Sequence, residues 1–348
     1  MFTIRRIPFT ATDHTYEVLI PLYGFGLDVD QVKLSEWDSL EKYSLESFRT
    51  LLEDWQEFRD FLRVFPPDYI LRVCFHDQNE YLIFTPGEDP LSGSGVWLRE
   101  DQEGVKAWID DILIAFRLFK KGFFVSGGKW LIATGTLTHN GQMVKVAATS
   151  CRVNEDTTAG SLIKSNGEGY CYYLDSTEIR AFCTFRDRIE QELEQVRLVP
   201  RMAVALDHLM SCYSVRRPTT HVIDLFICLE ALLKSRNDTS KRLNERVANV
   251  VSNSASQTAK LLERVQEFYK LRCAIVHGDA LQAEQELLLD HVGELRELVR
   301  NVFRFATDIG AKVGYGPQYY SKVHELAGNV FLKKEFIQDG LRTTTVTQ

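Results

Sequence analysis

Short runs of apolar residues dominate the chain from residue 15 to about residue 170. Examples are TYEVLIPLYGF, DYILRVCFHD, EYLIFTPG, GVWLRE, KWLIATGTLT and MVKVAAT, and Gly, Pro, Asn and Asp interrupt them. Runs of this length between such residues predict β-strands. Two stretches, about 44–64 and about 103–121, instead place apolar residues at helical spacing, and Gly122 follows the second. The first half is therefore predicted to be an α+β domain that is rich in strands.

Long helical patterns replace the strands after about residue 174. They cover 176–196, 199–214, 219–235, 238–252, 257–277 and 283–308, with short polar or proline-containing links. We predict a β-rich domain at 1–174 and an all-α bundle at 175–310. The C-terminal extension, 311–348, has one short helical pattern at 319–329, and its polar end is expected to fray.

Charge divides the chain in the same place. Residues 1–174 hold 17 Lys and Arg against 25 Asp and Glu, whereas 175–310 hold 19 against 20. A protein that binds nucleic acid through phosphates needs local positive potential. The second half could supply this potential more easily than the acidic first half.

Several function classes lack their motifs. VSGGKW has the wrong glycine spacing for a phosphate-binding loop, and neither H-E-x-x-H nor G-x-S-x-G occurs. The seven cysteines form no C-x-x-C pair and are odd in number, which favours reduced thiols. The longest apolar run, 222–233, is too short to span a membrane and contains two carboxylates. We expect a cytoplasmic protein with no metal, no cofactor and no membrane segment.

The segment FYKLRCAIVHGD, 268–279, combines a helical apolar pattern with two cationic side chains. Arg272 has no carboxylate three or four residues away on its own helix, so any partner must come from another element. Gly278 suits the left-handed conformation that ends a helix. His277 would then lie at the negative end of the helix dipole, which favours its protonated form.

The helix HVIDLFICLEALLKSR carries Asp224 and Glu230 inside its apolar run. Either carboxylate could pair with Arg272, because an unpaired buried charge is costly. We favour Glu230 as that partner. Glu230 could instead pair with Lys234, four residues later on the same helix.

Residues 175–310 resemble a HEPN domain of the Apea-like kind. The resemblance rests on L-E-A-L-L at 229–233 and, about 40 residues later, on Y-x-x-R-x-x-x-x-H-G, formed by Tyr269, Arg272, His277 and Gly278. The spacing R-x-x-x-x-H alone is weak, since about 0.6 occurrences are expected by chance in this chain. The helical context and the upstream L-E-A-L-L make the match specific.

The resemblance implies a metal-independent endoribonuclease that acts as a homodimer, with Arg272 and His277 of two copies lining one cleft. Residues five apart on an ideal helix point about 140° apart, so the two side chains of one copy converge only where the helix end frays. Such proteins often act as toxins or in defence against phage, controlled by a sensing domain, a regulatory protein or an antitoxin. The alternative is a non-catalytic HEPN module that binds a nucleotide, RNA or a protein partner, in which Arg272 is a structural ion pair and His277 caps the helix.

Further cations are candidates for contacts with an RNA backbone. They form a stripe on the last long helix, Arg296, Arg300 and Arg304, and a group around the start of the 238–252 helix that includes Arg242 and Arg246. Tyr269 is expected to belong to the core more than to stack on a base. His221, His76 and His324 have no constellation around them, and a sugar- or peptide-binding role for the first half would require an exposed aromatic groove.

Overall fold

The computed structural model describes residues 14–35, 38–44, 67–76, 83–84, 96–97, 103–126, 129–139, 142–152, 172–213, 218–235, 237–278 and 284–336. The chain forms two compact units. The first contains Met1–Arg117 and Gly122–Phe185, and the second contains Leu118–Lys121 and Arg186–Gln348. The division falls inside helix α5 (Ile179–Leu198), a short distance after the predicted boundary.

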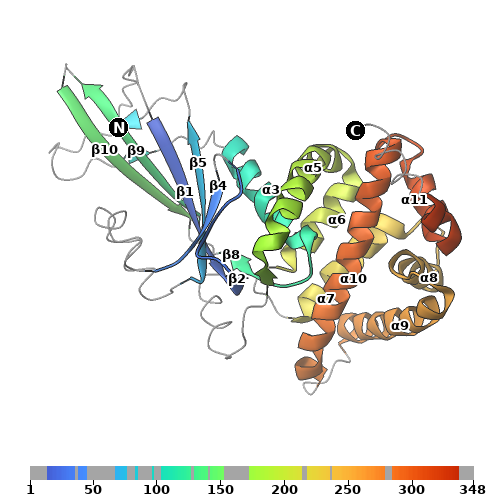
Figure 1. The fold of residues 1–348 in the computed structure, drawn as a ribbon. Coiled ribbons are helices and arrows are strands. Elements are labelled where there is room, and N and C mark those ends of the chain that lie inside the picture. The colour runs from blue at the N-terminus through green and yellow to red at the C-terminus, as the bar shows by residue number, and fades with distance from the viewer. Residues whose placement is uncertain are drawn as a thin grey trace, which may run out of the picture. The chain divides into compact units, whose positions relative to one another are not determined.

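An antiparallel sheet forms the centre of the first unit (Figure 1). Its strand order is β10-β9-β1-β5-β4-β3, with β8 beside β1. The strands are β1 (His14–Tyr23), β3 (Gln31–Lys33), β4 (Asp38–Lys42), β5 (Tyr69–His76), β8 (Val125–Ser126), β9 (Lys129–His139) and β10 (Gln142–Arg152). Strands β9 and β10 form a hairpin in which His139 lies opposite Gln142. Every strand pairing of this sheet is antiparallel.

Two small sheets, one helix, the 3-10 turn η1 (Ser176–Glu178) and the start of α5 complete the described part of this unit. Strand β11 (Tyr172–Leu174) lies parallel to β2 (Phe25–Leu27), and β6 (Ile83–Phe84) pairs with β7 (Val96–Trp97). Helix α3 (Glu103–Phe119) buries an apolar face that includes Ile112, Ala115 and Leu118 at the predicted spacing. These strands and α3 confirm the α+β prediction, whereas the predicted helix at 44–64 lies outside the described residues.

Aromatic rings fill the core where α3 meets the strands. Phe25 stacks on Tyr172, with ring centroids 5.1 Å apart, and Phe116 of α3 stacks on Phe182 at 4.2 Å. Phe124 meets Phe25 edge to face. The Tyr172 hydroxyl donates to the main-chain oxygen of Phe116 at 2.9 Å, so the one polar atom of this ring is also satisfied.

The second unit is helical. Its helices are α5 from Arg186 onward, α6 (Pro200–Ser211), α7 (Pro218–Leu233), α8 (Ser240–Val251), α9 (Ala255–His277), α10 (Glu284–Val313) and α11 (Tyr319–Ala327). Helix α10 runs the length of the unit in Figure 1. Helix α7 packs against α6, α8, α9, α10 and α11, which agrees with its almost continuous apolar sequence. No helix among the described residues is both long and apolar enough to cross a membrane.

The C-terminal extension is part of this unit through residue 336. Tyr319, Val323 and Leu326 of α11 are buried. In the helical segment 330–336, the buried Lys333 donates from Nζ to the main-chain oxygens of Asn249 at 3.0 Å and Val250 at 2.8 Å. This ammonium therefore caps the end of α8, where main-chain oxygens lack helical partners. The predicted fraying concerns residues beyond 336, which lie outside the described residues.

Candidate functional site

Helix α9 begins and ends where the sequence predicts. The Ser254 side chain accepts a hydrogen bond from the Gln257 main-chain nitrogen and caps the start of the helix. Gly278 has φ +79° and ends it in the left-handed conformation, with its N–H directed at the oxygens of Ala274 and Ile275. The predicted glycine cap is confirmed, and His277 occupies the last position of the helix.

Arg272 lies on α9 in a half-buried position. Its Nε atom is buried and has no hydrogen-bond partner. No carboxylate of the described residues lies within ion-pair distance of its guanidinium group. The arginine is therefore held partly out of water without the anion that would normally compensate it.

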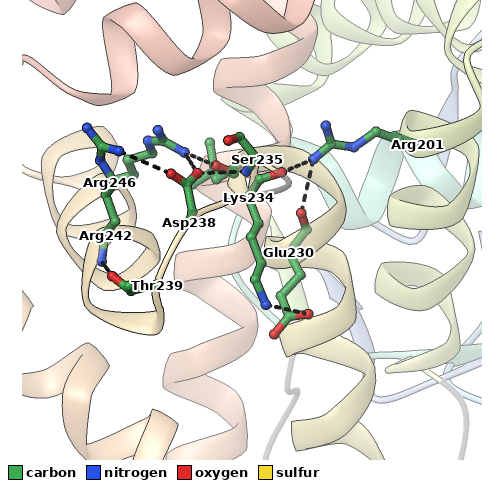
Figure 2. A network of polar contacts seen from close by, with 9 residues as sticks. Arg201, Glu230, Lys234, Ser235, Asp238, Thr239, Arg242 and Arg246 are labelled. Atoms are coloured by element: carbon green, nitrogen blue, oxygen red, sulfur yellow. Dashed lines mark hydrogen bonds and ion pairs between the residues drawn. The ribbon is translucent and has the colours of Figure 1, made fainter.

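Both carboxylates considered as partners of Arg272 bind elsewhere. Glu230 forms an ion pair with Lys234 at 3.5 Å, so the prediction of a Glu230–Arg272 pair is wrong and the alternative within α7 is confirmed (Figure 2). Asp224 accepts from His208 on α6 at 2.8 Å. Glu230 pairs with Lys234 because the two residues are four positions apart, so their side chains are neighbours as soon as α7 forms.

Cationic side chains lie around the C-terminal end of α7 and form hydrogen bonds and ion pairs there (Figure 2). Arg201 from α6 donates to the main-chain oxygens of Glu230 at 3.2 Å and Lys234 at 2.5 Å. Arg246 from α8 donates to the oxygen of Leu233 at 2.5 Å and forms an ion pair with Asp238. We call Arg201, Arg246, Asp238, Glu230 and Lys234 the α7-end network.

His277 is exposed at the end of α9. Because α9 is helical through His277, the five-residue separation directs Arg272 and His277 about 140° apart around the helix axis. The end of α9 is not frayed, so the two side chains of one copy do not converge. A shared site would need a second copy of the chain.

The apolar face of α9 is only partly covered. Among its residues only Val265 and Phe268 are fully buried, and Val276 is 50% exposed. Tyr269 packs edge to face on Phe226 of α7, with ring centroids 5.7 Å apart, in line with the expected core role. Toward its C-terminal end α9 thus presents apolar surface next to Arg272 and His277.

The arginine stripe of α10 faces inward, which corrects the idea that it tracks an RNA backbone. Arg296 and Arg300 are 8% and 7% exposed. Arg300 donates to the main-chain oxygen of Leu118, and Arg304 donates to that of Phe119, both at 3.1 Å. Their guanidinium groups therefore bind main-chain oxygens of the segment Leu118–Lys121, which belongs to the same unit as α10.

The two candidates on α8 differ from each other. The Arg246 side chain is 11% exposed and is paired within the α7-end network, so it is not available to an RNA backbone. Arg242 is exposed, with 66% of its side chain accessible, and lies 3.5 Å from Asp238. Arg242 stays a candidate for contact with a polyanion.

No protein-family model, curated protein or solved structure matches this chain. The comparisons therefore add no relative whose site could be carried over. In the part of the chain that the structure describes, no three His, Cys, Asp or Glu side chains are arranged to hold a metal ion.

His208 is a functional candidate that the sequence analysis missed. Its imidazole lies on α6 beside Asp224, on a helix whose polar residues gave no motif. The signal in the sequence was Asp224, one of two carboxylates in the apolar run of α7, which we considered only as a possible partner of Arg272. His324 lies in a different environment, because its neighbours include cations. Burial, followed by the positive charges of Arg246 and Arg201, lowers the pKa of His324 to about 4.

Proposed function

We propose that this protein is a metal-independent endoribonuclease of the HEPN type, with Arg272 and His277 as its catalytic residues. The observation that carries the proposal is the half-buried Arg272, which meets no carboxylate among the described residues and shares its helix end with an exposed histidine. An arginine that served only as a structural ion pair would have found Glu230 or Asp224. An unpaired guanidinium is instead ready to bind an anion such as a phosphodiester.

The two side chains fit the chemistry of cleavage by the ribose 2′-hydroxyl. Neutral His277 would take the proton of the 2′-hydroxyl, whose oxygen attacks phosphorus. The bond from phosphorus to the 5′-oxygen breaks, and a protonated His277 of the second copy gives a proton to that leaving oxygen. Arg272 would bind the non-bridging oxygens, where negative charge grows in the transition state. The products are a 2′,3′-cyclic phosphate and a 5′-hydroxyl.

A homodimer would supply the second histidine. Arg272 and His277 diverge around α9, and the apolar surface near them is half-exposed. A two-fold axis next to the end of α9 would cover this surface and place each arginine near the histidine of the other copy. The proposal extends to a toxin or anti-phage role, in which the β-rich unit senses a trigger, on the resemblance alone.

The test compares wild type with His277→Ala and Arg272→Ala on total tRNA and mRNA in EDTA, followed by end-group analysis. Both substitutions should lower cleavage by about 100-fold or more, because each removes a group that acts in the transition state. Lys260→Ala, an exposed cation at the other end of α9, serves as the matched control and should cleave normally. Circular dichroism and sedimentation check that fold and dimer persist.

Two outcomes would count against the nuclease. Cleavage that survives in both variants would place the activity elsewhere in the protein or in a contaminant. A wild type that dimerises and binds RNA or a nucleotide but cuts nothing would favour the non-catalytic HEPN module.

A further inference from the structure

A second arrangement of reactive groups lies between α6 and α7. His208 Nδ1 is 2.8 Å from Asp224 Oδ1. The hydroxyl of Ser211 lies 2.9 Å from Asp224 Oδ2 and also 2.9 Å from the main-chain oxygen of His208. We call His208, Asp224 and Ser211 the α6–α7 dyad site, because the histidine and the carboxylate carry its chemistry.

This site is separate from the end of α9. Asp224 and Phe226 are two residues apart on α7, so their side chains point about 160° apart. Phe226 contacts Tyr269 of α9, whereas Asp224 contacts α6. The dyad therefore lies on the side of α7 away from the α9 contact.

The hydrogen bond fixes which ring nitrogen of His208 is available. A carboxylate only accepts hydrogen bonds, so Nδ1 carries the proton of this contact, and in the neutral ring Nε2 has the free lone pair. The His208 side chain is 32% exposed, and none of the hydrogen bonds described for this ring involves Nε2. Val204, one turn earlier on α6, is 43% exposed, so solvent reaches this face of the helix.

Asp224 is well placed to activate the ring. Its side chain is only 11% exposed, and the two oxygens contact His208 and Ser211, so its orientation is fixed. Placing a carboxylate in an apolar helix is costly unless hydrogen bonds compensate it. If the pair only joined two helices, nothing would require the remaining ring nitrogen to be accessible. A carboxylate that holds Nδ1–H raises the electron density at Nε2 and stabilises the positive ring that forms when Nε2 reacts.

We propose that His208 is a phosphoryl-accepting nucleophile. The Nε2 lone pair attacks the phosphorus of a donor with a good leaving group, such as an acyl phosphate or a phosphoramidate. The new N–P bond forms as the bond from phosphorus to the leaving group breaks, and the leaving group departs with that electron pair. The proton on Nδ1 stays in its hydrogen bond to Asp224, which balances the positive charge of the ring.

The test treats the full-length protein with potassium phosphoramidate, from which ammonia leaves, and follows each histidine by mass spectrometry. Exposed His277 has no described carboxylate partner and serves as the comparator within the same chain. We expect His208 to be phosphorylated about tenfold faster than His277, because its ring is oriented and activated by a carboxylate. The product should carry phosphorus on Nε2.

Asp224→Asn keeps the shape of the site but removes the negative charge, and it should slow phosphorylation of His208 by about tenfold while leaving His277 unchanged. Ser211→Ala is the second variant, in case Asp224→Asn does not fold. It frees Asp224 Oδ2 and should slow the reaction less. The proposal is overturned if His208 reacts no faster than His277 in wild type, if phosphorus is found on Nδ1, or if a folded Asp224→Asn reacts at the wild-type rate.

Discussion

Two regions of the helical unit use arginine in opposite ways. In the α7-end network, Arg201 and Arg246 donate to main-chain oxygens or carboxylates (Figure 2). The Asp238 side chain is 2% exposed, and its two oxygens contact Arg242 and Arg246. Arg272 on α9 has a buried Nε without a partner. The charged groups of the network pair with one another and with main-chain oxygens, and so stabilise the α7–α8 connection. The guanidinium group of Arg272 on α9 has no such partner among the described residues. The surroundings, more than the residue type, separate a structural arginine from one that can bind substrate.

The largest expected effect lies in the network. Arg246→Ala leaves Asp238 buried with one strong partner missing, and it should lower the free energy of unfolding by about 3–5 kcal/mol. Arg242→Ala removes an exposed cation from the same carboxylate and should cost at most about 1 kcal/mol. Urea unfolding of both variants measures the difference. Equal losses would mean that burial does not distinguish the two arginines.

The electrostatics of Asp238 agree with this expectation. Burial alone would raise the pKa of its carboxyl group. The hydrogen bond from Ser235, followed by the contacts with Arg246 and Arg242, outweighs burial and lowers that pKa. The carboxylate therefore contributes stability at neutral pH, and this contribution is lost as pH falls through the lowered pKa.

A second prediction concerns packing near the end of α10. A Cβ atom on Gly310 would lie 2.2 Å from the Tyr315 ring, whose hydroxyl donates to Glu192 at 2.9 Å. Gly310→Ala should lower the free energy of unfolding by about 1–3 kcal/mol, because the ring must move. Gly293→Ala on the same helix meets open space and should raise stability by up to about 1 kcal/mol. Thermal melting that shifts both variants in the same direction would contradict this account.

Features that depend on residues close together in the sequence were predicted better than contacts between residues far apart in it. The helix boundaries of the second half and the glycine cap at Gly278 followed from periodicity and capping residues, which act within a few positions. The partner of Glu230 also proved local. The inward direction of Arg300 was not predictable from its stripe, because its acceptor, the oxygen of Leu118, lies 182 residues earlier.

His208 illustrates the same limit at a candidate site. Its pairing with Asp224 depends on the register in which α6 packs on α7, and that register has no signature in either helix. The lack of a partner for Arg272 could not be predicted either. A sequence shows that no carboxylate is near on the same helix, but it does not show whether another helix supplies one.

A third prediction uses His324, which lies near the network arginines. Its pKa is about 4 in the folded protein, against an ordinary value of 6.5 in the unfolded chain. Between these values the unfolded chain binds a proton that the folded protein does not, so stability is full above pH 6.5 and is lost as pH falls toward 4. Because His324 is half-buried, solvent screening limits the loss to about 1–2 kcal/mol.

His324→Gln tests this dependence, since glutamine keeps a polar side chain of similar reach without titrating in this range. Unfolding by urea at pH 7, 5.5 and 4.5 should show a smaller loss in the variant than in wild type. An identical pH dependence of the two proteins would exclude His324 as its source.

The smallest expected change in stability is at Arg272 itself. Arg272→Met replaces a half-buried, unpaired cation by an apolar side chain of similar length, so no ion pair is lost and the desolvated charge disappears. The free energy of unfolding should stay within about 0.5 kcal/mol of wild type or rise, while Arg246→Met falls by about 3 kcal/mol or more. Urea unfolding at several protein concentrations separates this effect from any change in dimerisation. A loss of about 2 kcal/mol at Arg272 would assign that arginine to the fold, and the contrast with the α7-end network would no longer point to a site.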